Sequence, residues 1–163
     1  MIGADLLAGI GGRQDWLKIV PEAFGTIKAE AGKDYADRLR RIHEGIVRVL
    51  REQKPDVVAI EEAFYGKSAS AALRMGEGRG VALVAVAQES RPLYQYTPAE
   101  VKKAVVGNGR AHKSQVQQMV RMILGLRQTP EPEDAADALA VAICHAQSAG
   151  GLARRIALAS AAR

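Results

Sequence analysis

Three carboxylic acids of the chain stand where metal-dependent chemistry could use them. The first, Glu61, closes a short apolar run over residues 57–60, in which three of four side chains are β-branched. Such a run between helical patterns predicts a strand covered on both faces. Ligands of open α/β sheets gather at the carboxyl ends of the strands, so Glu61 is placed to meet a substrate. The alternative is a strand that ends in an acid because it reaches solvent.

The other two acids, Asp134 and Asp137, lie three residues apart in a predicted helix among small and apolar side chains. This spacing puts both carboxylates on one helix face. Like charges so placed repel unless a cation lies between them or water screens them, and carboxylates are ligands that Mg²⁺ prefers. The alternative is that acids in a first helical turn stabilise the helix dipole, which suits Asp134 better than Asp137.

The charge distribution adds to this hypothesis. The chain has 23 Lys and Arg against 18 Asp and Glu, a net charge of +5, yet four carboxylates fall within residues 131–137. A basic chain favours a polyanionic partner. If Glu61 meets the acid pair, three carboxylates converge as in two-metal phosphoryl transfer. The pattern therefore indicates a nuclease, although periodicity alone does not show the convergence.

The remaining sequence supplies the elements that would hold these acids. Apolar residues at intervals of three and four predict a helix over residues 35–51, which Pro55 ends. Thr97 to Glu100 reads as a capping box with Pro98 at the first helical position, and that helix stops near Gly107. Further helices are expected over residues 68–88, 113–124 and 133–145, with strand-like stretches over 16–28, 57–61 and 91–96. This alternation predicts an α/β fold with a mixed central sheet flanked by helices.

Length and composition bound the remaining possibilities. A chain of 163 residues is one ordinary domain, which we expect over residues 1–147, followed by a basic, flexible tail over 148–163. No apolar stretch approaches the roughly 20 residues of a bilayer-spanning helix, so no membrane partner is expected. Cys144 is a single cysteine, and it can form neither an internal disulfide nor a cysteine metal site. The expected location is the cytoplasm.

Three segments carry a resemblance to a known family: VVAIEEAFYGKSASAALRMGEGRGVALVAVA, VKKAVVGNGRAHKSQVQQMV and DAADALAVAICH. Their order and spacing resemble the RuvC family of Holliday-junction resolvases over residues 37 to about 145. The resemblance implies a ribonuclease H-like fold, a homodimer, two Mg²⁺ ions per site that Mn²⁺ can replace, and paired symmetric nicks in four-way DNA junctions during recombination and repair. It also implies branch-migration partners of the RuvA and RuvB type.

The resemblance assigns roles to particular side chains. Glu61 matches the strand-borne catalytic acid, and Asp134 and Asp137 match the acid pair of the C-terminal helix, all three as metal ligands. Phe64 matches an aromatic residue that packs against an unpaired base. The expected DNA-binding residues are Phe64, Arg74, Lys102, Arg110 and Lys113, with the two lysines facing the scissile phosphate and with Gly107, Gly109 and His112 between them. His112 and His145 are interpreted as structural.

The N-terminus departs from the family pattern, which begins with a strand ending in a catalytic Asp. In one register residues 2–5 replace that strand, beside residues 57–61, and Asp5 becomes the acid. In the other, which we favour, residues 3–12 are the second strand, with residues 5–9 paired to 16–20 as an outer hairpin, and the first Asp is absent. The alternative function is then a junction-binding protein with impaired catalysis.

A predicted helix rich in small residues offers a surface for the dimer. Ala71, Ala72, Gly76 and Gly80 would let a second helix approach closely. Packing of the same residues on the chain's own sheet is the equally plausible alternative.

Overall fold

The computed structural model describes residues 4–5, 19, 21–28, 34–62 and 68–148 of the chain. The helices in this part are α1 (Tyr35–Gln53), α2 (Ala69–Gln88), α3 (Pro98–Val106), α4 (Lys113–Ile123) and α5 (Glu133–Gln147). The strands are β1 (Ala4–Asp5), β2 (Thr26–Ile27), β3 (Val58–Glu61) and β4 (Leu93–Tyr96). From residue 35 onward these elements confirm the predicted order, with ends that differ by a few residues. The predicted tail beyond residue 148 lies outside the described residues.

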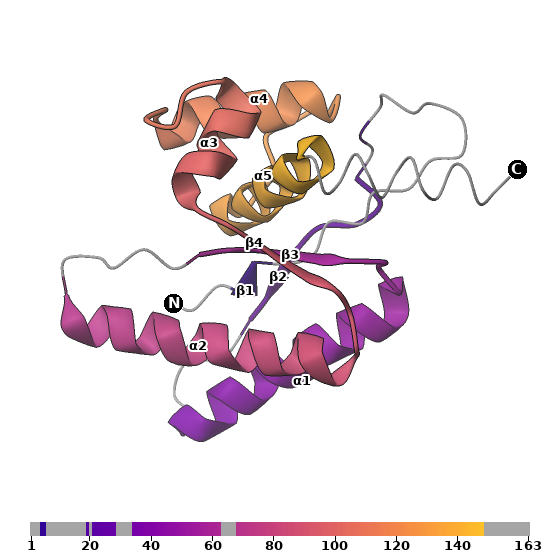
Figure 1. The fold of residues 1–163 in the computed structure, drawn as a ribbon, viewed down its shortest axis with the longest axis vertical. Coiled ribbons are helices and arrows are strands. Elements are labelled where there is room, and N and C mark those ends of the chain that lie inside the picture. Colours follow the sequence, from indigo (N-terminus) through magenta and orange to yellow (C-terminus); the bar gives the residue numbers. More distant parts are fainter. Residues whose placement is uncertain (1–3, 6–18, 20, 29–33, 63–67, 149–163) are drawn as a thin grey trace, which may run out of the picture.

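The elements form three layers (Figure 1). The strands lie in the middle, with α1 and α2 on one side and α3, α4 and α5 on the other. Strands β3 and β4 are parallel, with Val58 opposite Leu93 and Glu61 opposite Tyr96. Helix α2 connects them, as a parallel pair requires a crossover. The carboxyl ends of both strands therefore lie at the same edge of the sheet.

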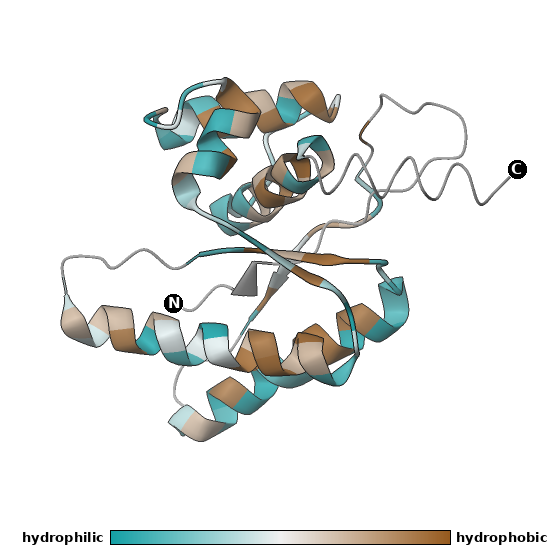
Figure 2. Cartoon of the chain, viewed as in Figure 1, coloured by the Kyte–Doolittle hydropathy of each residue, from teal (hydrophilic) through white to brown (hydrophobic). Residues whose placement is uncertain are grey.

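Two hydrophobic clusters lie on the two faces of the strands. Figure 2 shows the hydrophobic segments of the helices and strands in brown, interspersed with hydrophilic segments in teal. One cluster joins α1 and α2 to the sheet through Ile42, Leu50, Val58 and Ala85. The other joins α3, α4 and α5 to the opposite face. Its buried residues include Val101, Val105, Val116, Val120, Leu139 and Ile143. The two clusters hold the sheet from both faces and so fix β3 and α5, which carry the candidate acids.

The N-terminal strand takes a register that neither sequence alternative predicted. Ala4 lies opposite Ile27 and Asp5 opposite Thr26 in an antiparallel pair. Asp5 thus pairs neither with residues 57–61 nor with residues 16–20, and both predicted pairings of Asp5 are wrong. No local sequence signal sets this pairing. The partner strand β2 packs directly against α1, since a Cβ added at Gly45 would lie 2.7 Å from Cγ2 of Ile27. Most of the other N-terminal residues in the two predicted pairings lie outside the described part of the chain, namely residues 2–3, 6–9, 16–18 and 20.

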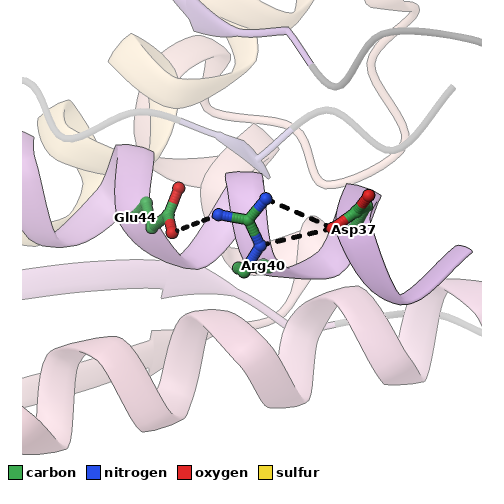
Figure 3. Close-up of polar contacts among 3 residues, drawn as sticks. All are labelled: Asp37, Arg40 and Glu44. Carbon is green, nitrogen blue, oxygen red and sulfur yellow. Dashed lines mark hydrogen bonds and ion pairs between the residues drawn. The ribbon is translucent and has the colours of Figure 1, made fainter. Parts of the chain in front are cut away.

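Helix α1 is amphipathic, and its outer face carries its own ion pairs. Arg40 donates to Glu44 at 2.7 Å and to Asp37 at 3.2 Å, as Figure 3 shows. Exposed pairs at these spacings stabilise a helix by only about 0.3–0.5 kcal/mol each. These charges therefore serve the helix surface, and the inner face with Ile42 and Leu50 provides the packing.

Local signals set the ends of the helices near the acids. The Thr97 hydroxyl accepts from the Glu100 N–H while the Glu100 carboxylate accepts from the Thr97 N–H, which confirms the capping box. Gly107 ends α3 at φ +83°, a conformation that favours glycine. His112 caps α4 by accepting from the Ser114 N–H, the structural role predicted for it. No helix within the described ranges is long and apolar enough to cross a membrane.

Candidate active site

Glu61 ends β3 with its side chain on the α5 side of the sheet. Side chains alternate along a strand. Val58 packs with α1 and α2, whereas Ala59 packs against the cluster that contains α5. Glu61, two residues after Ala59, shares its face. The structure therefore places Glu61 at the end of β3, as predicted, and directs its side chain towards α5.

Helix α5 brings the other acids to this edge because small side chains let it pack closely. Ala135, Ala136 and Ala138 are buried, and α5 contacts β3. Asp134 and Asp137 are partly exposed between these alanines, in the first turns of the helix.

The environment of Glu61 is both dehydrated and charged. Burial raises the pKa of the Glu61 carboxyl above its ordinary value, and the negative charge of Asp137 raises this pKa further. The positive charges of Lys102 and Lys113 oppose both effects. Glu61 and Asp137 are thus close enough for their charges to interact, although they come from different elements.

Lys113, the first residue of α4, binds the acid helix directly. Its Nζ lies 3.0 Å from Oδ2 of Asp137 and 3.1 Å from Oε2 of Glu133. Partial burial lowers the pKa of the Lys113 ammonium, but the hydrogen bonds to Asp137 and Glu133 outweigh burial and raise this pKa overall. The same contact lowers the pKa of the Glu133 carboxyl. Sequence reasoning missed Glu133, although its position four residues before Asp137 puts both on one helix face.

The expected cluster of three acids is not formed among the described residues. In this part of the chain no three Asp, Glu, His or Cys side chains lie close enough to hold a metal ion. Asp137 instead forms an ion pair with the Lys113 ammonium. What the structure brings together is a pair, Glu61 and Asp137, whose oxygen ligands and mutual repulsion fit a divalent cation in their chemistry.

The residues expected to bind DNA fall into three groups. Lys102 on α3 is partly exposed, and its charge acts on Glu61, which places it beside the site. Arg110, in the loop before α4, and Arg74, on α2, are exposed. Phe64 lies outside the described part of the chain. So does the side chain of Asp5, which is expected as a catalytic acid in one of the two N-terminal registers and not as a DNA-binding residue.

A polar cluster that sequence reasoning did not assemble ties α5 to β4. The buried His145 ring lies 4.6 Å from the ring of Tyr94, and its Nδ1 is 2.8 Å from the hydroxyl of Tyr96. The same hydroxyl lies 3.0 Å from Ser148 Oγ. Tyr96 is opposite Glu61 in the sheet, so this cluster fixes α5 relative to the strand end that carries the acid. His145 is structural, as expected.

A three-layer α/β domain with an acid at a strand end, a facing acid on the last helix and two lysines beside them defines a ribonuclease H-like protein of the nuclease type. The family model for "Crossover junction endodeoxyribonuclease RuvC" matches residues 13–145. The chain belongs to the RuvC family.

Individual relatives agree with this assignment. The RuvC of Caldanaerobacter subterraneus is 47% identical over 131 residues, covering 80% of this chain and 79% of the relative. That of Chloroflexus aggregans is 48% identical over 130 residues, with the same coverage. The structure of Thermus thermophilus RuvC superposes with a TM-score of 0.76 at 35% identity, covering 92% of this chain and 87% of that one. The same protein in complex with a Holliday junction substrate gives a TM-score of 0.77 at 35% identity, covering 90% and 86%.

These comparisons confirm the resemblance read from the sequence and the ribonuclease H-like fold. The matched residues contain Glu61, Asp134 and Asp137, whereas Asp5 lies outside them. The roles of these particular side chains stay predictions.

Proposed function

We propose that this chain is a metal-dependent endonuclease that resolves four-way DNA junctions by paired symmetric nicks in recombination and repair. The observation that carries the proposal is that Glu61, at the end of β3, lies within electrostatic range of Asp137, near the start of α5, and of Lys102 and Lys113, with Lys113 paired to Asp137. The names of the relatives, together with a solved neighbour that is in complex with a Holliday junction substrate, support the substrate class.

The side chains suit hydrolysis of a phosphodiester. A partly buried carboxylate such as Glu61 is costly to ionise, so it binds a cation or takes up a proton more readily than an exposed one. Lys102 and Lys113 add positive charge at the same edge, where they attract the phosphate and stabilise charge that develops on it. Two bound Mg²⁺ ions, or Mn²⁺ in their place, would supply the activated water and neutralise the leaving oxygen. Glu61 and Asp137 are the described pair that would bind such an ion, and Asp134, which the resemblance adds, is proposed as a further ligand.

The test uses a synthetic four-way junction, with and without Mg²⁺. The parent should produce paired nicks, whereas Glu61→Gln, Asp134→Asn and Asp137→Asn should abolish them and leave junction binding largely intact, since binding comes chiefly from phosphate contacts. The matched control is Glu44→Gln, which removes a carboxylate from the exposed face of α1. An Asp137→Asn protein that cuts at the parent rate contradicts the assignment.

A second candidate function, a junction-binding protein with impaired catalysis, is favoured by two observations. Asp5 lies outside the residues that match the family, and the described acids form a pair rather than a group of three. The same assay separates the candidates: a mobility shift with no nicks in either Mg²⁺ or Mn²⁺ supports the second.

We further propose that the protein acts as a homodimer through α2. Leu73, Gly76, Gly80 and Val84 are spaced by three or four residues and share one helix face. The side chains of Leu73 and Val84 are 65% and 52% exposed, and no described residue lies within 4 Å of a Cβ built on either glycine. A four-way junction has two strands to cut at two-fold-related positions, so a symmetric pair of sites suits it.

Two measurements test the assembly. Sedimentation at micromolar concentration should show a dimer for the parent and a monomer for Leu73→Glu, and a monomeric parent contradicts the proposal. Pull-down with branch-migration proteins of the RuvA and RuvB type tests the remaining expected partners.

A further inference from the structure

One guanidinium joins the ends of both parallel strands beneath the candidate active site. Arg79 lies on α2, and its Nη1 donates to the main-chain carbonyl of Glu61 at 2.8 Å. Its Nη2 donates to the side-chain oxygen of Gln95 on β4. A planar guanidinium holds two acceptors in fixed relative positions, as a lysine ammonium does not. Arg79 therefore ties α2, β3 and β4 together at the residue that ends β3.

The hydrogen-bond pattern of β3 explains why the Glu61 carbonyl needs this donor. The Val58 N–H donates to Pro92 at 2.8 Å and the Glu62 N–H donates to Tyr96 at 2.7 Å, so even-numbered residues of β3 point their peptide groups at β4. The peptide groups of Glu61 then point to the other edge. Among the described residues β3 pairs with β4 alone. Arg79 supplies the donor that a neighbouring strand would otherwise give.

Arg79 acts on the main chain of Glu61 and approaches from the face opposite to its carboxylate. The guanidinium comes from α2, whereas the Glu61 side chain faces α5. Fixing the peptide at the strand end fixes the direction in which the side chain leaves it. Both terminal nitrogens of Arg79 bind groups of the protein itself. Arg74, on the same helix, is instead exposed to solvent.

We propose that Arg79 is a positioning residue that sets the place of the Glu61 carboxylate for strand cleavage by holding its main-chain carbonyl. The inference rests on the proposed nuclease function. Because a misplacement of about 1 Å can cost roughly 100-fold in rate, loss of this anchor should lower the turnover rate strongly without weakening DNA binding.

The decisive variant is Arg79→Ala, with cleavage of a saturating junction and junction affinity measured side by side. We expect the single-turnover rate to fall about 100-fold while the dissociation constant changes less than about twofold. Millimolar methylguanidinium should restore part of the rate, because it can occupy the vacated position and donate to the same carbonyl. A variant that had only lost stability would gain nothing from this additive.

Further variants keep the test informative if Arg79→Ala folds poorly. Arg79→Lys can reach one of the two acceptors and should retain an intermediate rate, and Gln95→Ala should cause a smaller loss that does not add to that of Arg79→Ala. Arg48→Ala removes the same charge from an exposed position on α1 and should cut like the parent.

The outcomes separate this inference from the function on which it rests. A parent that does not cut overturns the proposed function and the role of Arg79 with it. A parent that cuts, together with an Arg79→Ala protein that cuts equally well, overturns the role of Arg79 alone. Loss of rate and affinity in parallel, or loss of rate that neither methylguanidinium nor Arg79→Lys restores, also overturns it.

Discussion

Replacing Lys113 by Met separates the ion pairs that this side chain forms in the structure from the phosphate contact that the resemblance predicts for it. Met keeps the apolar stem and removes the ammonium that bridges Asp137 and Glu133 at 3.0 and 3.1 Å. The side chains of Lys113, Asp137 and Glu133 are 45%, 33% and 69% exposed, so water and salt screen both pairs. Exposed pairs are worth about 0.2–1 kcal/mol each, and the more buried Asp137 pair belongs near the upper limit.

The free energy of unfolding should therefore fall by about 1 kcal/mol at low salt, which corresponds to about 2–4 °C in melting temperature for a chain of this size. Because the Debye length is about 3 Å at 1 M salt, most of this difference should disappear there. Urea unfolding of parent and variant at both salt concentrations measures it. The matched control is Lys103→Met, which removes an exposed ammonium from α3. A loss above about 3 kcal/mol, or one that salt does not reduce, refutes the reasoning.

Junction binding tests the second role. If Lys113 also contacts a phosphate, Lys113→Met should flatten the dependence of log affinity on log salt by about 0.9, the contribution of one released counterion. An unchanged slope would mean that Lys113 serves the acids alone.

Three further variants probe the site and its support. Glu61→Gln should raise the melting temperature at pH 7 in EDTA. Since the pKa of the Glu61 carboxyl is raised in the folded state, the parent loses stability as pH rises from about 4.5 through that pKa, so the difference should vanish below pH 4.5; a variant that gains nothing at pH 7 contradicts this. Leu139→Ala, at a fully buried position of α5, should lower the free energy of unfolding by about 2–5 kcal/mol in urea titrations, and a cost below about 1 kcal/mol would show that α5 is loosely packed. Thr97→Ala removes one half of the capping box and should lower the free energy of unfolding by about 0.5–2 kcal/mol, whereas Thr97→Ser should leave this free energy unchanged.

Local signals in the sequence predicted the elements that they specify directly. The capping box at Thr97 and the apolar run before Glu61 each depend on adjacent residues, and both elements form where expected. The pairing of β1 with β2 could not be read in this way, because it joins residues more than twenty positions apart and β2 itself packs on α1 through Ile27 and Gly45. The ion pair between Lys113 and Glu133 likewise depends on how α4 packs on α5. The resemblance predicted that Glu61, Asp134 and Asp137 converge, whereas the described residues form no group of three acids, and Glu61 interacts with Asp137. It did not predict that Lys113 bridges Asp137 and Glu133.

The tight packing of helix α5 limits the amino-acid substitutions that this protein can accept there. Ten of its fifteen residues are buried, and five of these are alanines, where a larger side chain would have to displace packed neighbours. A random substitution there would shift the helix and its two aspartates together, so a change that harms folding would harm chemistry as well. Divergence within this lineage should then accumulate on surfaces such as the outer face of α1, where Asp37, Arg40 and Glu44 are exposed and replaceable. Adaptation of the nuclease to a new temperature or a new DNA sequence would have to come from outside the helix that holds its acids.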